Sequence, residues 1–342
     1  MSEVEKAVAS GDAGAVKRES ARRTRRSFLV GGAVAAAGYG VSQWIANSKP
    51  EGRLQAGLRE TLDVDAAINR AVFEERGLAP TYALSEARPL RLNGTVGLEQ
   101  KLIPESWRLQ LIGSANAAGS PRYVQDVTAW EYQYEAKEQG PSALAPDFKS
   151  APKAESKAGQ AKELTLAERF ELMAQQVSGK RRQGDAEAGP SASTPDIGTP
   201  GLLLTMDDVL ALPRQELVTQ FKCIEGWSEI VHWGGVRMRD FIAAYPPVKN
   251  AQGELPKYVY METPNGDYYT GYELRECMHP QSLLVTEMAA KPLTQYHGAP
   301  LRLHMPIKYG YKQIKRIGLI AYTDERPDDY WTKLGYDWYA GL

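Results

Sequence analysis

Cysteine is scarce in this sequence: its 342 residues include only Cys223 and Cys277. Two cysteines exclude a disulfide-rich scaffold and a cysteine-ligated iron–sulfur cluster, and the sequence has no Cys-x-x-Cys-His site for covalent haem attachment. The chain therefore lacks an electron relay of its own, and any electrons that it handles must come from another molecule.

An excess of charge of one sign is also missing. The formal net charge is −1 at pH 7, so the overall charge does not favour binding to nucleic acid. Hydrophobic residues make up 43% of the chain, which permits a sizeable core. The arginines are unevenly spread, and one N-terminal stretch contains Arg18, Arg22, Arg23, Arg25 and Arg26.

The N-terminal region lacks an apolar run long enough for a typical membrane-spanning helix. Residues 30–38 are only mildly apolar, and they follow the pair Arg25-Arg26 in the order that resembles a Tat export signal. We therefore expect residues 1–48 to be a signal or an uncleaved anchor. The protein would then act in the periplasm or on the outer face of the cytoplasmic membrane. A basic amphipathic tail is the alternative interpretation.

The next part of the chain divides by composition. Residues 49–87 are expected to be partly helical, with Asp63 and Asp65 as caps, and two short strands are expected at 89–97 and 107–113. Residues 114–200 are mostly rich in Ala, Gly, Ser, Pro, Lys and Glu, which predicts a low-complexity insertion. Two islands interrupt it, an aromatic stretch at 123–134 and a predicted helix at 165–177.

Residues 201–342 predict a dense mixture of strands and short helices. A helix from Thr205 through Leu212 and another at 236–244, ended by Pro246-Pro247, are expected. The strands are expected at residues 221–224, 258–261, 301–305 and 314–322. Strands and short helices without a regular βαβ repeat indicate an α+β fold.

Cys223 is the first candidate for chemistry, because it lies where a predicted strand enters a turn that contains Gly226. A thiolate there is a soft ligand suited to metals that favour sulfur. Taken alone, a buried inert thiol is the more common role of such a residue. A disulfide between Cys223 and Cys277 is a further alternative in an exported protein.

A basic run near the C-terminus adds a candidate anion site. Arg302 is followed by Lys308, Lys312, Lys315 and Arg316. Arginine can hold a phosphate through two parallel hydrogen bonds, while lysine acts as a point charge. The alternative is a solvated basic strand edge, which is the common interpretation of an isolated Lys/Arg cluster.

Several motifs occur together in one order. They are Cys-Ile-Glu-Gly-Trp-Ser at 223–228, Met-Glu-Thr at 261–263, His-Gly-Ala-Pro-Leu-Arg at 297–302 and the Lys/Tyr-rich run at 308–315. In combination they resemble the molybdopterin-binding domain of the sulfite oxidase superfamily, and within it the catalytic subunit of periplasmic methionine sulfoxide reductase. The resemblance is strong over residues 201–342 and does not cover 114–200. It implies one such domain over 88–342, interrupted by the insertion.

The resemblance also implies a set of site residues. Cys223 matches the ligand of molybdenum in a molybdenum–molybdopterin (Mo-MPT) cofactor. Glu225 and Tyr336 match residues near the metal that can move protons, although simple aromatic packing is an equal alternative for Tyr336. The residues that match contacts to the pterin or its phosphate are Asn93, Thr263, His297, Arg302, Gln313, Ile314 and Lys315.

One departure from the superfamily bears on the substrate. Sulfite oxidases place arginines just after the ligand cysteine, whereas this chain has Gly226, Trp227 and Ser228 there. We therefore expect a small-molecule sulfoxide or similar S- or N-oxide as substrate, and electrons from a separate haem-bearing or membrane partner. Any contact with a membrane would be through an uncleaved N-terminal segment or through that partner. The alternative is a non-catalytic envelope assembly or binding module that retains the fold.

Overall fold

The computed structural model describes residues 38–51, 54–74, 77–136 and 198–341, with backbone only for 50, 51 and 54–56. The chain divides into two units, residues 1–65 and 66–342. In the first unit, residues 38–47 are helical and β1 (Pro50–Glu51) pairs with β2 (Leu54–Gln55). Helix α3 (Ala56–Val72) crosses the boundary, and it contains Asp63 and Asp65 in its interior, so the prediction that these residues cap it is wrong. Within the described residues, no helix is long and apolar enough to span a membrane.

The second unit contains two sheets. The first is antiparallel, with the order β11-β10-β7-β6 and with β12 also paired to β10. Its strands are β6 (Arg214–Lys222), β7 (Ser228–Arg237), β10 (Leu283–Met288), β11 (Lys291–Pro292) and β12 (Arg302–His304). The second has the order β4-β5-β3-β13-β8-β9, and among these neighbours only β13 and β3 run parallel. Its strands are β3 (Leu109–Ile112), β4 (Tyr123–Val124), β5 (Gly201–Leu204), β8 (Tyr258–Glu262), β9 (Tyr269–Glu273) and β13 (Leu319–Thr323).

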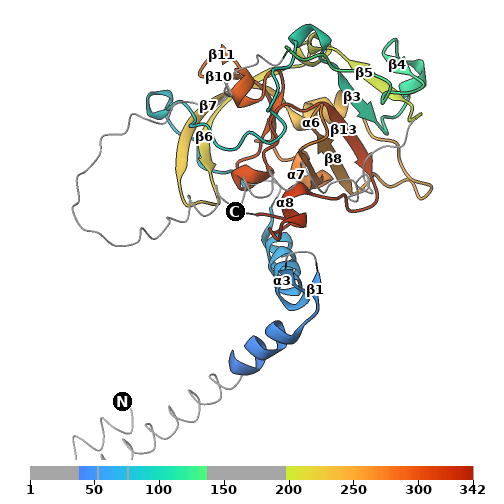
Figure 1. Cartoon of the computed structure of the whole chain (residues 1–342). Helices are drawn as coiled ribbons and strands as arrows, with labels where there is room; N and C mark the ends of the chain where they lie inside the picture. Colours follow the sequence, from blue (N-terminus) through green and yellow to red (C-terminus); the bar gives the residue numbers. More distant parts are fainter. Residues whose placement is uncertain (1–37, 52–53, 75–76, 137–197, 342) are drawn as a thin grey trace, which may run out of the picture. The chain divides into compact units, whose positions relative to one another are not determined.

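Short helices complete this unit, with α6 and α7 between the two sheets (Figure 1). The α-helices are α5 (Met206–Leu210), α6 (Met238–Ala244), α7 (Leu274–Cys277) and α8 (Tyr330–Lys333). The single-turn 3₁₀ helices are η1 (Leu84–Glu86), η2 (Pro104–Ser106), η3 (Ala117–Gly119), η4 (Gln295–His297) and η5 (Gly310–Lys312). Two sheets, one antiparallel and one mixed, together with short helices confirm the predicted α+β class.

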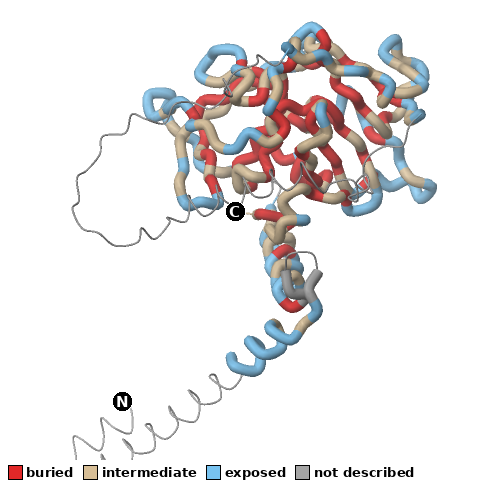
Figure 2. The backbone as a smooth tube through the Cα atoms, viewed as in Figure 1, coloured by how far each residue is buried: buried red, intermediate tan, exposed pale blue. Residues whose placement is uncertain are grey.

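Both faces of the antiparallel sheet carry buried apolar side chains. Leu284 of β10 and Leu303 of β12 belong to the main core, which the second sheet shares. On the other face, Phe221, Trp233 and Val285 form a second cluster that includes Cys223. Figure 2 shows the buried segments concentrated along the strands in the middle of this unit. The second cluster therefore places Cys223 against a closely packed sheet face.

Several local predictions are confirmed, because their signals lie in neighbouring residues. Thr205 caps α5, its side chain accepting from the Asp208 backbone N–H while the Asp208 carboxylate accepts from the Thr205 backbone N–H. The predicted strands at 107–113 and 258–261 correspond to β3 and β8. Helix α6 begins at Met238, two residues later than predicted, because Val236 and Arg237 pair with β10.

The predicted strands at 89–97 and 314–322 are wrong in whole or in part, because strand pairing depends on distant partners. Residues 89–97 form no strand, and the Arg91 backbone N–H donates to the Glu229 carboxylate at 2.7 Å. Strand β13 begins at Leu319, so residues 314–318 of the predicted strand lie outside it. Residues 114–136 of the expected insertion include η3 and β4, and Val127 is fully buried. The predicted helix at 165–177 lies outside the described residues.

Candidate active site

Cys223 lies in the tight connection between β6 and β7. Lys222 pairs with Ser228, so residues 223–227 form the turn of a hairpin. The Cys223 N–H donates to the Trp227 carbonyl at 2.9 Å, and the Gly226 N–H donates to the Cys223 carbonyl at 3.1 Å. Gly226 has a φ of +91°, a conformation that favours glycine. The backbone therefore fixes the cysteine at the end of the sheet.

The Cys223 thiol is buried, with 8% of the residue exposed, and it lies beside Asn93 and Lys315. Burial raises the pKa of the thiol, and a hydrogen bond with the Asn93 side chain acts in the opposite direction. The Lys315 ammonium donates to the backbone carbonyls of Asn93 and Gly94. Burial, together with the charge of Arg302 and against the effect of Cys223, lowers the pKa of Lys315 to about 7. Loop 88–97 and the 313–316 segment thus meet at the cysteine.

Arg302 is a buried cation with few hydrogen-bond partners. Its side chain is fully buried in β12, and its Nη1 donates to the His297 carbonyl at 3.1 Å. Within the described residues, its Nε and Nη2 have no hydrogen-bond partner and no carboxylate forms an ion pair with it. Burial lowers its pKa to about 10, so it is still cationic at neutral pH. An uncompensated buried cation of this kind fits an anionic ligand.

The side chains of His297 and Thr263 both form hydrogen bonds within the protein. His297 Nε2 contacts the Leu90 carbonyl at 3.0 Å, and burial lowers the pKa of the imidazole. Thr263 follows β8 and is 2% exposed, with its hydroxyl donating to Asn265 Oδ1 at 2.8 Å. A Cβ on Gly97 would meet Thr263 Cγ2 at 2.6 Å. Loop 88–97 therefore approaches Thr263 as closely as glycine allows.

Gln313 and Ile314 turn away from the cysteine. Gln313 Oε1 accepts from His304 Nδ1 at 2.8 Å, and its amide nitrogen donates to the Lys308 carbonyl at 2.9 Å. Ile314 is 1% exposed and belongs to the main core. Of the three adjacent residues singled out from the sequence, Lys315 is the one whose charge acts on Cys223.

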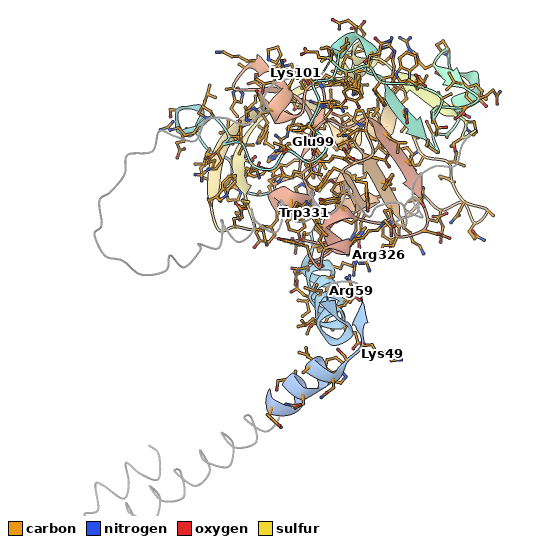
Figure 3. The ribbon with its side chains drawn as sticks, viewed as in Figure 1. Lys49, Arg59, Glu99, Lys101, Arg326 and Trp331 are labelled. Atoms are coloured by element: carbon orange, nitrogen blue, oxygen red, sulfur yellow. The ribbon has the colours of Figure 1, made fainter. Side chains whose placement is uncertain are left out.

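Glu225 and Tyr336 both interact electrostatically with Cys223. Glu225 is exposed, and its Oε2 accepts from Trp227 Nε1 at 2.9 Å. The Tyr336 ring packs against Trp331 and Tyr311, with centroids 5.1 and 5.3 Å away; Trp331 is labelled in Figure 3. Burial, followed by the charges of Glu225 and Cys223, raises the pKa of Tyr336 to about 12. Tyr336 therefore packs against other aromatic rings, and its hydroxyl also lies close enough to Glu225 and Cys223 for their charges to affect its pKa.

Two residues of this region were not predicted from the sequence to act in it. Trp233 stacks on His304, with centroids 4.6 Å apart, and the Arg302 guanidinium lies over the Trp233 ring at 5.1 Å. The only sequence signal for Trp233 and His304 was their place in buried strands, and such a pattern does not distinguish a functional site from the hydrophobic core. Both cysteines are free, so the alternative of a Cys223–Cys277 disulfide is wrong.

The residues present fit a molybdenum–pterin group. Cys223 can supply the thiolate, and buried polar atoms without a hydrogen-bond partner in the described part of the chain include Asn93 Oδ1 and Nε and Nη2 of Arg302. No cluster of three or more His, Cys, Asp or Glu side chains in the described ranges could hold a metal ion by itself. A single cysteine beside an anion site matches a metal that is held mainly by its own organic ligand.

Comparisons with known proteins agree with this arrangement. Residues 197–331 match the family model of the oxidoreductase molybdopterin binding domain. The chain is 36% identical over 137 residues to an Azospira oryzae protein named as the YedZ1 subunit of protein-methionine-sulfoxide reductase, which covers 40% of this chain and 50% of the relative. It is 35% identical over 155 residues to the catalytic subunit MsrP of protein-methionine-sulfoxide reductase from Campylobacter jejuni, covering 41% and 52%. The chain thus spans about half the length of these relatives.

A solved structure, the sulfane dehydrogenase SoxCD from Paracoccus pantotrophus, matches with a TM-score of 0.33 and 20% identity. It covers 37% of this chain and 36% of that one, and so low a score adds nothing to the argument. The family match, the two sheets and the cysteine at the hairpin agree with one another. Residues 197–331 are therefore similar to the oxidoreductase molybdopterin binding domain.

Proposed function

We propose that the protein is a molybdenum–molybdopterin oxidoreductase that reduces a sulfoxide, or a similar S- or N-oxide, by two-electron oxygen-atom transfer. The observation that best supports this is the buried Cys223 thiol beside Asn93 and Lys315, in the same domain as the unpaired cation Arg302. The relatives named for protein-methionine-sulfoxide reductase support the substrate class.

In this proposal each residue has one task. Cys223 ligates the metal, and Asn93, Thr263, His297, Arg302 and Lys315 bind the pterin and its phosphate. When bound, the cofactor supplies the two-electron redox chemistry. The overall conversion of a sulfoxide to a sulfide consumes two electrons and two protons and releases water. Tyr336, protonated at neutral pH because its pKa is about 12, can donate a proton at its hydroxyl, and the exposed Glu225 can exchange protons with water.

The surroundings of Cys223 favour a neutral oxide over an oxyanion. Ile224, Glu225 and Gly226 are exposed and include no cation. Arg91 lies 4.5 Å from the Trp227 ring, but it pairs with Glu229 at 2.8 Å, so its charge is already compensated. An anionic substrate would meet the exposed Glu225 carboxylate, which opposes its binding.

The source of electrons and the place of action are further parts of the proposal. The sequence has no cysteine set for a cluster and no covalent haem site, so electrons would come from a separate haem-bearing or membrane partner. The twin arginines Arg25 and Arg26 support export through the Tat pathway to the periplasm or the outer face of the cytoplasmic membrane.

The test is the molybdenum and pterin content of the full chain purified from a host that makes the cofactor. We expect about one molybdenum atom per chain in the wild type and almost none in Cys223→Ser, because a hydroxyl replaces the soft ligand. Cys277→Ser is the matched control, since Cys277 is buried and belongs to the main core. It should retain its molybdenum.

Reduction of methyl sulfoxides should follow the molybdenum content across these variants. Unchanged molybdenum in a folded Cys223→Ser variant would rule out the ligand assignment. A folded wild type with neither molybdenum nor pterin would instead favour a non-catalytic assembly or binding module.

A further inference from the structure

Three buried donors lie together without a hydrogen-bond partner in the described part of the chain. They are Nε and Nη2 of Arg302 and Nε1 of Trp233. Leaving a buried donor unsatisfied is costly, and native folds rarely do so. The same fold satisfies another buried indole, because Trp107 Nε1 donates to the Ile317 carbonyl at 2.9 Å. The Trp233 indole N–H is therefore an exception to this pattern, a buried donor that no other described group occupies.

Trp233 contacts two side chains of β12. Arg302 and His304 are two residues apart, so they point to the same face of the sheet. The His304 ring stacks on Trp233 with an interplanar angle of 23°, and the Arg302 guanidinium lies over the same indole. His304 is itself fixed, by Thr219 at 2.7 Å and Gln313 at 2.8 Å. The indole is thus a rigid platform, fully excluded from solvent.

An aromatic ring and a carboxylate differ in how many guanidinium N–H groups they leave free to bind another ligand. A carboxylate partner would neutralise the guanidinium and occupy its N–H groups. An indole stabilises the cation through its ring face, so the N–H groups at the guanidinium edge stay available. Arg302 keeps both its charge and two donors in this way, which suits an anion that binds later.

We infer that Trp233 is a binding and positioning residue for the phosphate monoester of the pterin cofactor: its ring orients Arg302, and its Nε1–H donates to the same anion. The inference rests on the proposed function for the identity of the ligand. The anion site itself rests on the three unsatisfied donors and on the stack of His304, Trp233 and Arg302.

The experiment titrates inorganic phosphate by calorimetry into the full chain from a host that cannot make the pterin. It also counts pterin per chain after expression in a host that can. The variants are Trp233→Phe and Trp233→Leu, with Trp107→Phe as the control for loss of a buried indole N–H elsewhere. Circular dichroism establishes that each variant is folded.

We expect Trp233→Phe to bind phosphate several-fold more weakly, because it loses the N–H and phenylalanine is a poorer platform than tryptophan. Trp233→Leu, which loses the ring, should bind about tenfold more weakly or worse. Pterin content should fall in the same order, and Trp107→Phe should match the wild type in both measurements. If Trp233→Leu does not fold, Trp233→Phe compared with Trp107→Phe decides.

Wild-type phosphate affinity and pterin content in folded Trp233→Phe would overturn the inference. A wild type that binds phosphate through Trp233 but acquires no pterin would retire the proposed function and leave the anion site. A wild type that acquires pterin independently of Trp233 would retire this inference alone.

Discussion

His304 is a neutral side chain in the most deeply buried part of the site. It is fully buried, and it contacts Thr219, Gln313 and the Trp233 ring. Burial, together with the nearby charge of Arg302 and against the hydrogen bond to Gln313, lowers its pKa to about 3. A protonated imidazole would place a second cation beside Arg302, so the fold depends on the neutral form.

This predicts a loss of stability in mild acid. Below about pH 6.5 the unfolded chain protonates this histidine, whereas the folded chain does not until about pH 3. Each pH unit in that window should lower the free energy of unfolding by up to about 1.4 kcal/mol through His304. Urea unfolding at several pH values should therefore show a shallower pH dependence in His304→Gln than in the wild type. Equal slopes between pH 6 and 4 would contradict the burial of a neutral imidazole.

Sequence motifs predicted the members of the site better than their orientations. The structure brings Asn93, Glu225, Lys315 and Tyr336 to Cys223, although Asn93 lies 130 positions away in the sequence. Gln313 and Ile314 are adjacent to Lys315, yet their side chains contact other parts of the fold. Their directions depend on packing that no local pattern contains, and the roles of all these residues in chemistry stay predictions.

Helix α8 links the buried ion pair of Asp329 and Lys312 to the surroundings of Tyr336. Asp329 Oδ1 accepts from the backbone N–H groups of Trp331 and Thr332 at 3.0 and 3.1 Å. Its Oδ2 accepts from Lys312 at 2.5 Å, and both side chains of this ion pair are 1% exposed. Because Trp331 packs on Tyr336, the Asp329–Lys312 pair also fixes one wall beside the candidate proton donor.

Asp329→Asn should therefore destabilise the protein strongly. Asparagine keeps the helix cap, but it leaves the Lys312 ammonium buried without a counter-charge, which costs about 3–5 kcal/mol. Asp328→Asn is the matched control, because Asp328 pairs with Lys333 at 3.0 Å with 37% and 47% of the side chains exposed. Its cost should stay below about 1 kcal/mol. Similar unfolding free energies for the two variants would show that the buried pair is not a structural anchor.

Local signals predicted elements, and distant pairing set their limits. Thr205 and Asp208 sufficed for α5 because a capping box needs only adjacent residues. Residues 89–97 have an extended pattern, but their neighbours are side chains such as Glu229 and Lys315 and not another strand. The start of β13 at Leu319 likewise depends on β3 and β8, its partners from far along the chain.

At the scale of the whole chain, the structure changes how the expected insertion should be tested. Strand β4 pairs with β5, and Tyr132 donates through its hydroxyl to the Arg108 and Gly318 carbonyls, both at 2.8 Å. Residues 114–136 thus contribute to the second sheet and its surroundings. A deletion that asks whether the insertion recruits partners should begin at residue 137 and end at 197, because a cut at 114 would remove part of the fold.

The last prediction concerns the route to the compartment of action. If residues 1–48 are a Tat signal, Arg25→Lys with Arg26→Lys should hold the protein in the cytoplasm, because the receptor reads the arginine pair and not its charge. The matched control is Arg22→Lys with Arg23→Lys, which makes the same chemical change three residues earlier. Cell fractionation with pterin counting should find the control outside and the first variant inside, already loaded with pterin, since this pathway carries folded proteins. Equal export of both variants would mean that another feature of the chain directs it.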